Sequence, residues 1–194
     1  MKYLLKKIYL ILLLIAILSS GTAIIAKDNE IEYSREDISN YFSGIVSASQ
    51  NYTDEAFEHL NKVQSLKSSH SNFNIQFIRT LVLLDKFDQA FAFSKDIWKE
   101  DKYFFEVDLL LGLKSFVEKD YLMAEKYFER LNKISKYNLF FEDFFGNILL
   151  SWNEAAKNNF SSSLEFFRKI PNSYENIKEI QNSFLQCYFD TSEA

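Results

Sequence analysis

The chain has 194 residues, with four glycines, one proline and a formal charge of −5. Tight turns between strands depend on glycine and proline, so this composition argues against a sheet protein and favours an all-α fold. The acidic balance excludes nucleic acid as an expected partner, because a phosphate backbone would be repelled. The single cysteine, Cys187, excludes an internal disulfide.

Residues 1–26 have the composition of an export leader. Three lysines, Lys2, Lys6 and Lys7, precede an apolar run from Ile8 to about Leu18, and small residues follow. The segment is therefore predicted to direct the rest of the chain out of the cytoplasm.

Two interpretations of this leader stay open. It is a signal peptide cleaved after Ala23 or Ala26, or an uncleaved anchor, since Ile8 to Ala26 approaches the ~20 residues that cross a bilayer. Either way the protein is expected to be periplasmic, or anchored in the inner membrane with its remainder outside the cytoplasm, and to contact membrane only through residues 1–26. Without the three leader lysines, the formal charge falls from −5 to −8. Residues 27–36 are interpreted as a linker.

A period of 34 residues begins after the linker. Ala56, Ala90 and Ala124 follow one another at this step, and Gly44 and Gly112 each lie twelve residues before one of them. A fourth copy fits if five residues are inserted near 135–143, which places Ser151 and Ser163 at the two small-residue positions, with Phe160, Phe167 and Ile170 at apolar ones.

The clearest copy is "LGLKSFVEKDYLMAEKYFERL", with Leu111-Gly112, Tyr121, Ala124 and Phe128 at its characteristic positions. This pattern resembles the tetratricopeptide repeat, of an exported or membrane-anchored bacterial type, over residues 37–171. The resemblance implies an α-α superhelix of about four helix hairpins, over about 37–70, 71–104, 105–143 and 144–171, preceded by an N-terminal hydrophobic helix. In each hairpin, small residues let the first helix (helix A) approach the second (helix B), while aromatic residues fill the space between repeats.

Residues 172–194 are predicted to form a further helix. Its apolar stripe comprises Ile177, Ile180, Phe184 and Tyr188, and Cys187 is expected to be a small buried hydrophobe beside it. The segment is either a capping helix or the start of a fifth repeat.

No catalytic, cofactor or metal site is expected. The two histidines, His59 and His70, lack the neighbours of a metal-binding motif, and the glycines do not cluster into a phosphate-binding loop. Carboxylates such as Glu125 and Glu129 alternate with cations, as on a solvated helix face.

The resemblance implies a binding groove lined by the A helices. The positions at which some family members clamp a carboxylate are here Tyr41, Ile45, Gln76, Glu106 and Leu110, so that ligand class is not expected. The predicted groove is instead an apolar strip with one arginine, made of Tyr41, Ile45, Ile75, Arg79, Leu109, Leu113, Phe116, Ile148 and Trp152.

An alternative assignment makes the same strip part of the core. Asn40, Asn74, Asp108 and Asn147 occupy A-helix positions that the family normally keeps apolar, so the A helices could be rotated by about one residue.

The expected function is a protein-interaction scaffold that binds an apolar segment of a protein or peptide partner. The first alternative is a structural, membrane-tethered subunit that self-associates or joins an envelope complex. A periplasmic enzyme using paired carboxylates is a further alternative.

Overall fold

The structure is a computed structural model that describes residues 33–135 and 144–190. The described helices belong to one compact unit, Ser34–Ala194. The predicted leader and N-terminal helix, and most of the insertion near residue 140, lie outside the described residues. Among the residues described, no helix has both the length and the apolar character needed to span a bilayer.

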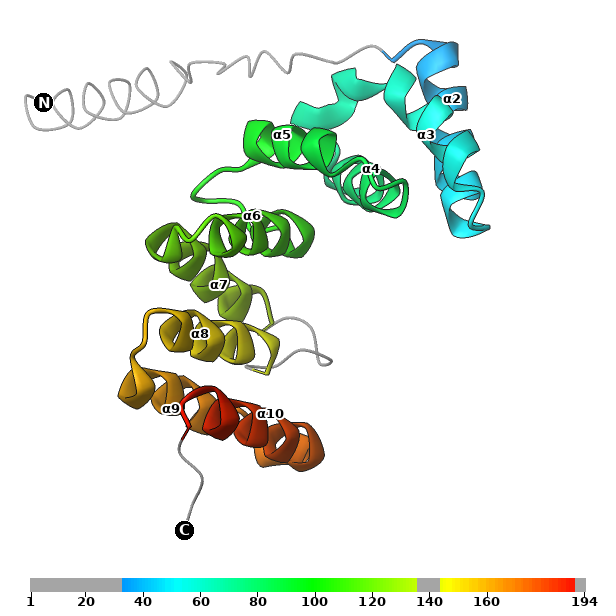
Figure 1. Cartoon of the computed structure of the whole chain (residues 1–194). Coiled ribbons are helices and arrows are strands. Elements are labelled where there is room, and N and C mark those ends of the chain that lie inside the picture. The colour runs from blue at the N-terminus through cyan, green and yellow to red at the C-terminus, as the bar shows by residue number, and fades with distance from the viewer. Residues whose placement is uncertain (1–32, 136–143, 191–194) are drawn as a thin grey trace, which may run out of the picture. The chain divides into compact units, whose positions relative to one another are not determined.

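The described chain forms successive helix pairs, as predicted (Figure 1). The pairs are α2 (Arg35–Ser49) with α3 (Thr53–Lys62), α4 (Ser71–Leu83) with α5 (Phe87–Ile97), α6 (Phe105–Val117) with α7 (Tyr121–Ser135), and α8 (Phe145–Ala156) with α9 (Phe160–Arg168). Short 3-10 turns, η1 (Gln64–Ser68) and η2 (Asn172–Tyr174), lie in two connectors, and α10 (Glu175–Tyr188) follows the last pair.

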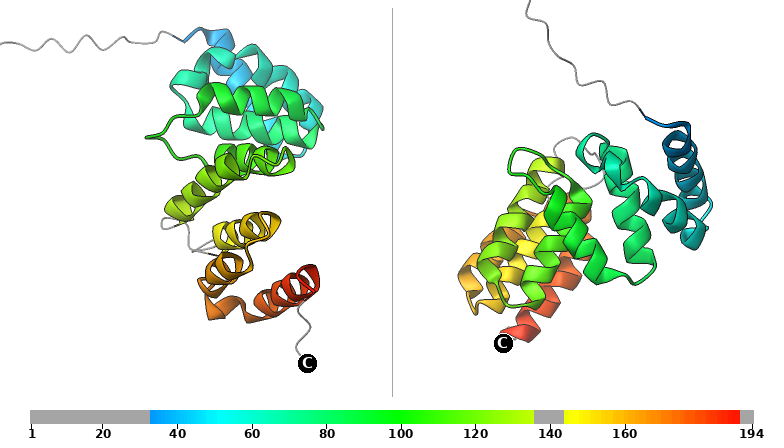
Figure 2. Two further views of the ribbon diagram at one scale, coloured as in Figure 1. Left: turned by 60° about the vertical axis from the view of Figure 1, so that its left-hand side comes forward. Right: turned by 90° about the horizontal axis from the view of Figure 1, so that it is seen from above.

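Each B helix packs against the A helix of its own pair and against the next A helix: α3 contacts α4, α5 contacts α6, and α7 contacts α8. The A helices α2, α4 and α6 also contact one another in sequence. Both further views show the same succession along the chain (Figure 2). These contacts confirm the predicted superhelix of hairpins.

The small residues at the repeating positions lie at helix contacts, as expected. Ala56, Ala90 and Ala124 are fully buried. A Cβ atom added to Gly44 would stand 2.6 Å from Leu60 Cγ, and one added to Gly112 would stand 2.5 Å from Phe128 Cε1. Helix A can therefore approach helix B only because these two positions carry no side chain.

The second hairpin departs from this pattern but conserves volume. Ile78 occupies the position of Gly112, and Ser94 occupies that of Phe128; both are buried. The large and small partners have exchanged helices, so a similar total volume fills the contact, which is the kind of change that cores tolerate best.

The four turns between A and B share one geometry. Asn51, Asp85, Lys119 and Asn158 have positive φ values of 62°, 55°, 65° and 59°. In the first turn the Asn51 amide donates to the Ala48 carbonyl and the Tyr52 amide donates to Ser47, and equivalent bonds recur in the other three. This is the Schellman motif, which ends a helix through one left-handed residue.

The C-terminal segment forms the predicted helix, α10, but the side of the helix that is buried is not the one predicted. The stripe of Ile177, Ile180, Phe184 and Tyr188 is 40–56 % exposed, and Leu185 is the residue buried against the preceding hairpin. Cys187 is exposed, so its prediction as a buried residue is wrong. The reason is that Leu185 faces α8 and α9, whereas Cys187 lies two residues, or about 200°, farther around the helix. The stripe flanks the buried side, and its member Tyr188 meets Trp152 of α8.

The glycine contact predicts the effect of adding one methyl group. Gly112→Ala gains about 1 kcal/mol of helix propensity but places a Cβ against the buried Phe128 ring, and such overpacking costs about 1–3 kcal/mol. We expect a net loss of up to about 2 kcal/mol in the free energy of urea unfolding. Gly112→Ala combined with Phe128→Leu should lose less than the sum of the two single changes; strict additivity would argue against the contact.

The turn geometry predicts a stabilising change at Lys119. A non-glycine residue at positive φ is strained, so Lys119→Gly should raise the free energy of unfolding by about 0.5–1 kcal/mol. The control is Lys119→Ala, which removes the same charge but keeps the Cβ, and it should stay close to the parent. Equal gains from glycine and alanine would assign the effect to charge instead of backbone conformation.

Candidate functional site

Polar residues occupy one equivalent, inward-facing position on each A helix. Asn74, Asp108 and Asn147 are buried, and Asn40 is half-buried. The A helices are therefore not rotated in a way that would bring these polar positions to the surface. Each residue has its own polar contact: Asn40 with His59 on α3, Asn74 with the Lys67 carbonyl, Asp108 with Arg130 on α7, and Asn147 with Asn132 on α7.

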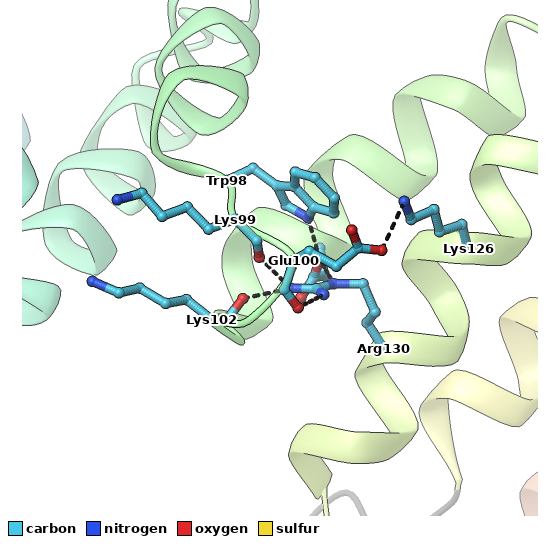
Figure 3. A network of polar contacts seen from close by, with 7 residues as sticks. Trp98, Lys99, Glu100, Lys102, Lys126 and Arg130 are labelled. Carbon is cyan, nitrogen blue, oxygen red and sulfur yellow. Dashed lines mark hydrogen bonds and ion pairs between the residues drawn. The ribbon is translucent and has the colours of Figure 1, made fainter.

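Arg130 makes the most extensive of these contacts. Its Nε donates to Asp108 Oδ1 at 2.7 Å, and their side chains are 5 % and 0 % exposed. Its other nitrogens donate to the backbone carbonyls of Lys99, Glu100 and Lys102, in the connector between α5 and α6 (Figure 3).

Aromatic rings complete the surroundings of this guanidinium. It lies 5.0 Å from the ring centroid of Trp98 and 4.5 Å from that of Tyr103. The Trp98 indole N–H also donates to Asp108 Oδ1, at 3.0 Å. One cation therefore joins α6, α7 and the connector between two repeats.

Burial dominates the titration of Asp108. Desolvation raises the pKa of its carboxyl above the ordinary value, although hydrogen bonding and charge from Arg130 act in the opposite direction. Both Arg130 and Trp98 donate to Oδ1, whereas Oδ2 is buried with no hydrogen-bond partner in the described part of the chain. Burial also raises the pKa of Tyr127, with a smaller contribution from the charge of Asp108.

The predicted strip lies on the A helices with graded exposure. Arg79 and Leu113 are exposed, and the other members are half-buried: Tyr41, Ile45, Ile75, Leu109, Phe116, Ile148 and Trp152. Contacts between neighbouring repeats involve two of them. The Tyr41 hydroxyl accepts from Asn72 at 3.1 Å, and Arg79 pairs with Glu106 of α6 at 2.5 Å.

The lower part of the strip contributes to packing. Leu109 and Phe116 pack against a buried cluster around Phe128, and Ile148 and Trp152 against one around Leu185. Trp152 also donates from Nε1 to Gln181 Oε1 at 2.7 Å and meets the Tyr188 ring edge-on at 6.0 Å. Helix α10 therefore engages this end of the strip.

Sequence reasoning missed the most exposed apolar residues of α2. Ile38, Phe42 and Val46 are 48 %, 60 % and 51 % exposed. Phe42 follows Asn40, which contacts α3, by two residues, or about 200° around the helix, so it faces away from α3. The four-residue spacing of Ile38, Phe42 and Val46 in the sequence could have revealed this stripe.

Exposed apolar residues occur on the corresponding side of α4 and α6. These are Leu83 on α4 and Leu113 and Val117 on α6. We call the six residues the A-helix face: Ile38, Phe42, Val46, Leu83, Leu113 and Val117. Among the residues described here, no group of three or more histidine, cysteine, aspartate or glutamate side chains could hold a metal ion.

No protein-family model and no curated protein matches the chain. Two solved structures resemble its fold. A MamA mutant aligns with a TM-score of 0.59 at 13 % identity, covering 79 % of this chain and 88 % of that one. A MamA chain labelled MSR-1 aligns with a TM-score of 0.54 at 15 % identity, covering 81 % and 94 %. MamA is a tetratricopeptide-repeat protein.

The chain has a tetratricopeptide-like fold. At such low identity the likeness concerns architecture alone. The Arg130–Asp108 pair joins the two helices of the third hairpin, and both of its side chains are buried.

The buried pair predicts a stability loss that depends on pH. Arg130→Met leaves the Asp108 carboxylate buried without its cation, which should cost about 3–5 kcal/mol at neutral pH. Without the guanidinium the pKa of Asp108 rises further. When the folded-state pKa of a carboxyl is raised, the protein is most stable below the pKa of the unfolded state, 3.8, where the carboxyl is neutral in both states. That stability is lost as the pH rises through the folded-state pKa, because the buried carboxyl then becomes charged. The loss of unfolding free energy caused by Arg130→Met should therefore become smaller as the pH is lowered toward about 4.

Urea unfolding at about pH 4.5 and about pH 7 measures this difference. The matched control, Arg130→Met with Asp108→Asn, has no carboxyl to titrate, so its loss should change little between the two values. A loss in Arg130→Met that is the same at both pH values would contradict the account.

Proposed function

We propose that the hairpins form a protein-interaction scaffold whose A-helix face binds an apolar segment of a protein or peptide partner. The observation that carries the proposal is the exposure of large apolar side chains on α2 and α6, on the sides turned away from their B helices. The fold supports the same general role, because tetratricopeptide-like hairpins present their A helices as a binding surface.

The chemistry of the face defines the segment it fits. Ile38, Phe42 and Val46 offer one apolar row on α2, and Leu113 and Val117 offer another on α6. Between them, the Arg79 side chain is 56 % exposed while it pairs with Glu106. A segment with two apolar anchors separated by a polar stretch would match this order, with Arg79 free to donate further hydrogen bonds.

The original strip of predicted groove residues remains part of this proposal. Tyr41, Ile45, Ile75 and Leu109 lie half-buried beside the more exposed face and would form its floor. Trp152 is a poor probe of binding, because its contacts with Gln181 and Tyr188 mean that truncation also loosens α10.

We further propose that residues 1–26 export or anchor the protein, so that the partner is met outside the cytoplasm. The support is the lysine-rich, apolar and small-residue order of that segment. Sequencing the N-terminus of the protein recovered from the cell envelope tests it: a start after Ala23 or Ala26 indicates cleavage, and an intact leader indicates an anchor.

A membrane-tethered, self-associating subunit is the second candidate. The exposed stripe of α10, with Ile180, Phe184 and Tyr188 more than half exposed, favours it. A stable oligomer in sedimentation experiments that Phe184→Glu converts to a monomer would support this candidate.

The scaffold proposal predicts selective loss of peptide binding. A displayed peptide library selected on the full chain should yield apolar sequences, and Phe42→Glu with Leu113→Glu should weaken their binding by at least about 10-fold in calorimetry. Both residues are exposed, so each substitution should change stability by less than about 0.5 kcal/mol.

The matched control is Leu122→Glu, because Leu122 is 77 % exposed on the B helix α7. It should leave binding unchanged. If Leu122→Glu weakens binding as much as the double variant, or if selection yields no apolar sequence, the A-helix face is not the binding surface.

A further inference from the structure

A pocket separate from the A-helix face lies between two connectors that each lead from a B helix into the next A helix. It encloses about 140 Å³, and its walls come from η1 and the start of α4 on one side and from the α5–α6 connector on the other. The lining residues that matter are Lys67, Asn74, Ile97, Lys99, Lys102 and Phe104.

Arg130 determines how the lysines of this pocket are presented. It binds the carbonyl oxygens of Lys99, Glu100 and Lys102, and a backbone bridge pairs Lys99 with Lys102, whose amide donates to the Lys99 carbonyl at 3.3 Å. The two lysine side chains extend in the same direction, away from Arg130 (Figure 3). The backbone contacts thus place both lysines on the same side of the connector.

The charges of this pocket are not balanced internally. Its lining contains three lysines and one aspartate, and Lys67 already pairs with Asp96 at 2.5 Å. Within residues 33–135 and 144–190, neither Lys99 nor Lys102 forms an ion pair. Like charges on paired positions repel, and an anion between them would offset that repulsion. In a chain of net charge −5, this local excess of cations is unexpected.

The opposite wall adds polar groups. No side chain at the N-cap caps α4, and its first turn contains no acidic residue. Asn74 is 4 % exposed and donates to the Lys67 carbonyl at 2.9 Å, while its Oδ1 has no hydrogen-bond partner in the described chain. The positive end of α4 therefore forms part of this wall. The unpartnered Asn74 Oδ1 is an acceptor, so a carboxylate would lie away from it, toward the lysines.

The remaining wall is apolar and limits the size of a ligand. Ile97 is buried and Phe104 half-buried where they line the pocket. A cavity of about 150 Å³ accommodates a benzene ring, so this pocket suits a group of about six heavy atoms.

We propose that this pocket binds a small organic carboxylate with a short apolar stem. The carboxylate oxygens lie between the ammonium groups of Lys99 and Lys102, near the start of α4, and the stem rests on Ile97 and Phe104. Binding relieves the repulsion between the two lysines. It also links the connector that follows the first hairpin to the connector that follows the second.

Butanoate is the test probe, titrated into the full chain at constant ionic strength and followed by amide NMR shifts. We expect saturable shifts at residues 67–71 and 96–104. The neutral isostere butanamide should produce none, and inorganic phosphate, which has no stem, should bind at least about 10-fold more weakly. Equal shifts with butanoate and phosphate, or shifts that never saturate, would overturn the proposal by showing an adventitious ion or screening only.

The variant is Lys99→Gln with Lys102→Gln, which should weaken butanoate binding by about 10-fold or more. It should fold normally, because Arg130 holds this connector through backbone carbonyls. The charge-matched control is Lys62→Gln with Lys133→Gln, exposed residues that do not line the pocket, and it should bind like the parent. Unchanged binding in the first variant would overturn the assignment. The A-helix face is not involved, so peptide binding and butanoate binding can fail independently.

Discussion

The buried ion pair between Arg130 and Asp108 is the constraint on which the middle of the structure depends. Removing two charges from water is expensive, and pairs of this kind often add little net stability. Its geometry suggests a different benefit. Arg130 satisfies three carbonyl oxygens of the α5–α6 connector, so the pair fixes the path by which the chain leaves the second hairpin and enters the third.

Two surfaces depend on that path. Once the connector is fixed, α6 lies where Glu106 reaches Arg79 of α4, which aligns the A helices that carry the exposed apolar face. The same connector turns Lys99 and Lys102 toward η1 and α4, where they line the pocket. A single buried cation thus connects the register of the repeats with the two surfaces proposed to bind ligands.

The hairpins could be predicted because their main determinants are local and periodic. The 34-residue recurrence of Ala56, Ala90 and Ala124 marks contacts that admit only small residues, and the structure confirms them. The connector could not be predicted, because the partners of Arg130 are backbone carbonyls about 30 residues earlier, which leave no side-chain pattern. The orientation of α10 was also beyond reach: a stripe of four apolar residues does not reveal that Leu185, outside it, makes the buried contact.

The polar position on each A helix has a different partner in each repeat. An apolar residue there would pack equally well against several arrangements of its neighbours, whereas Asn40, Asn74, Asp108 and Asn147 each require a particular partner. Asn40 and Asp108 bond to the second helix of their own hairpins, whereas Asn74 and Asn147 bond to the segments that precede theirs. Polar contacts would then specify how the helices of a hairpin pair and how a hairpin joins the one before it, and apolar contacts such as Gly112 against Phe128 would supply stability.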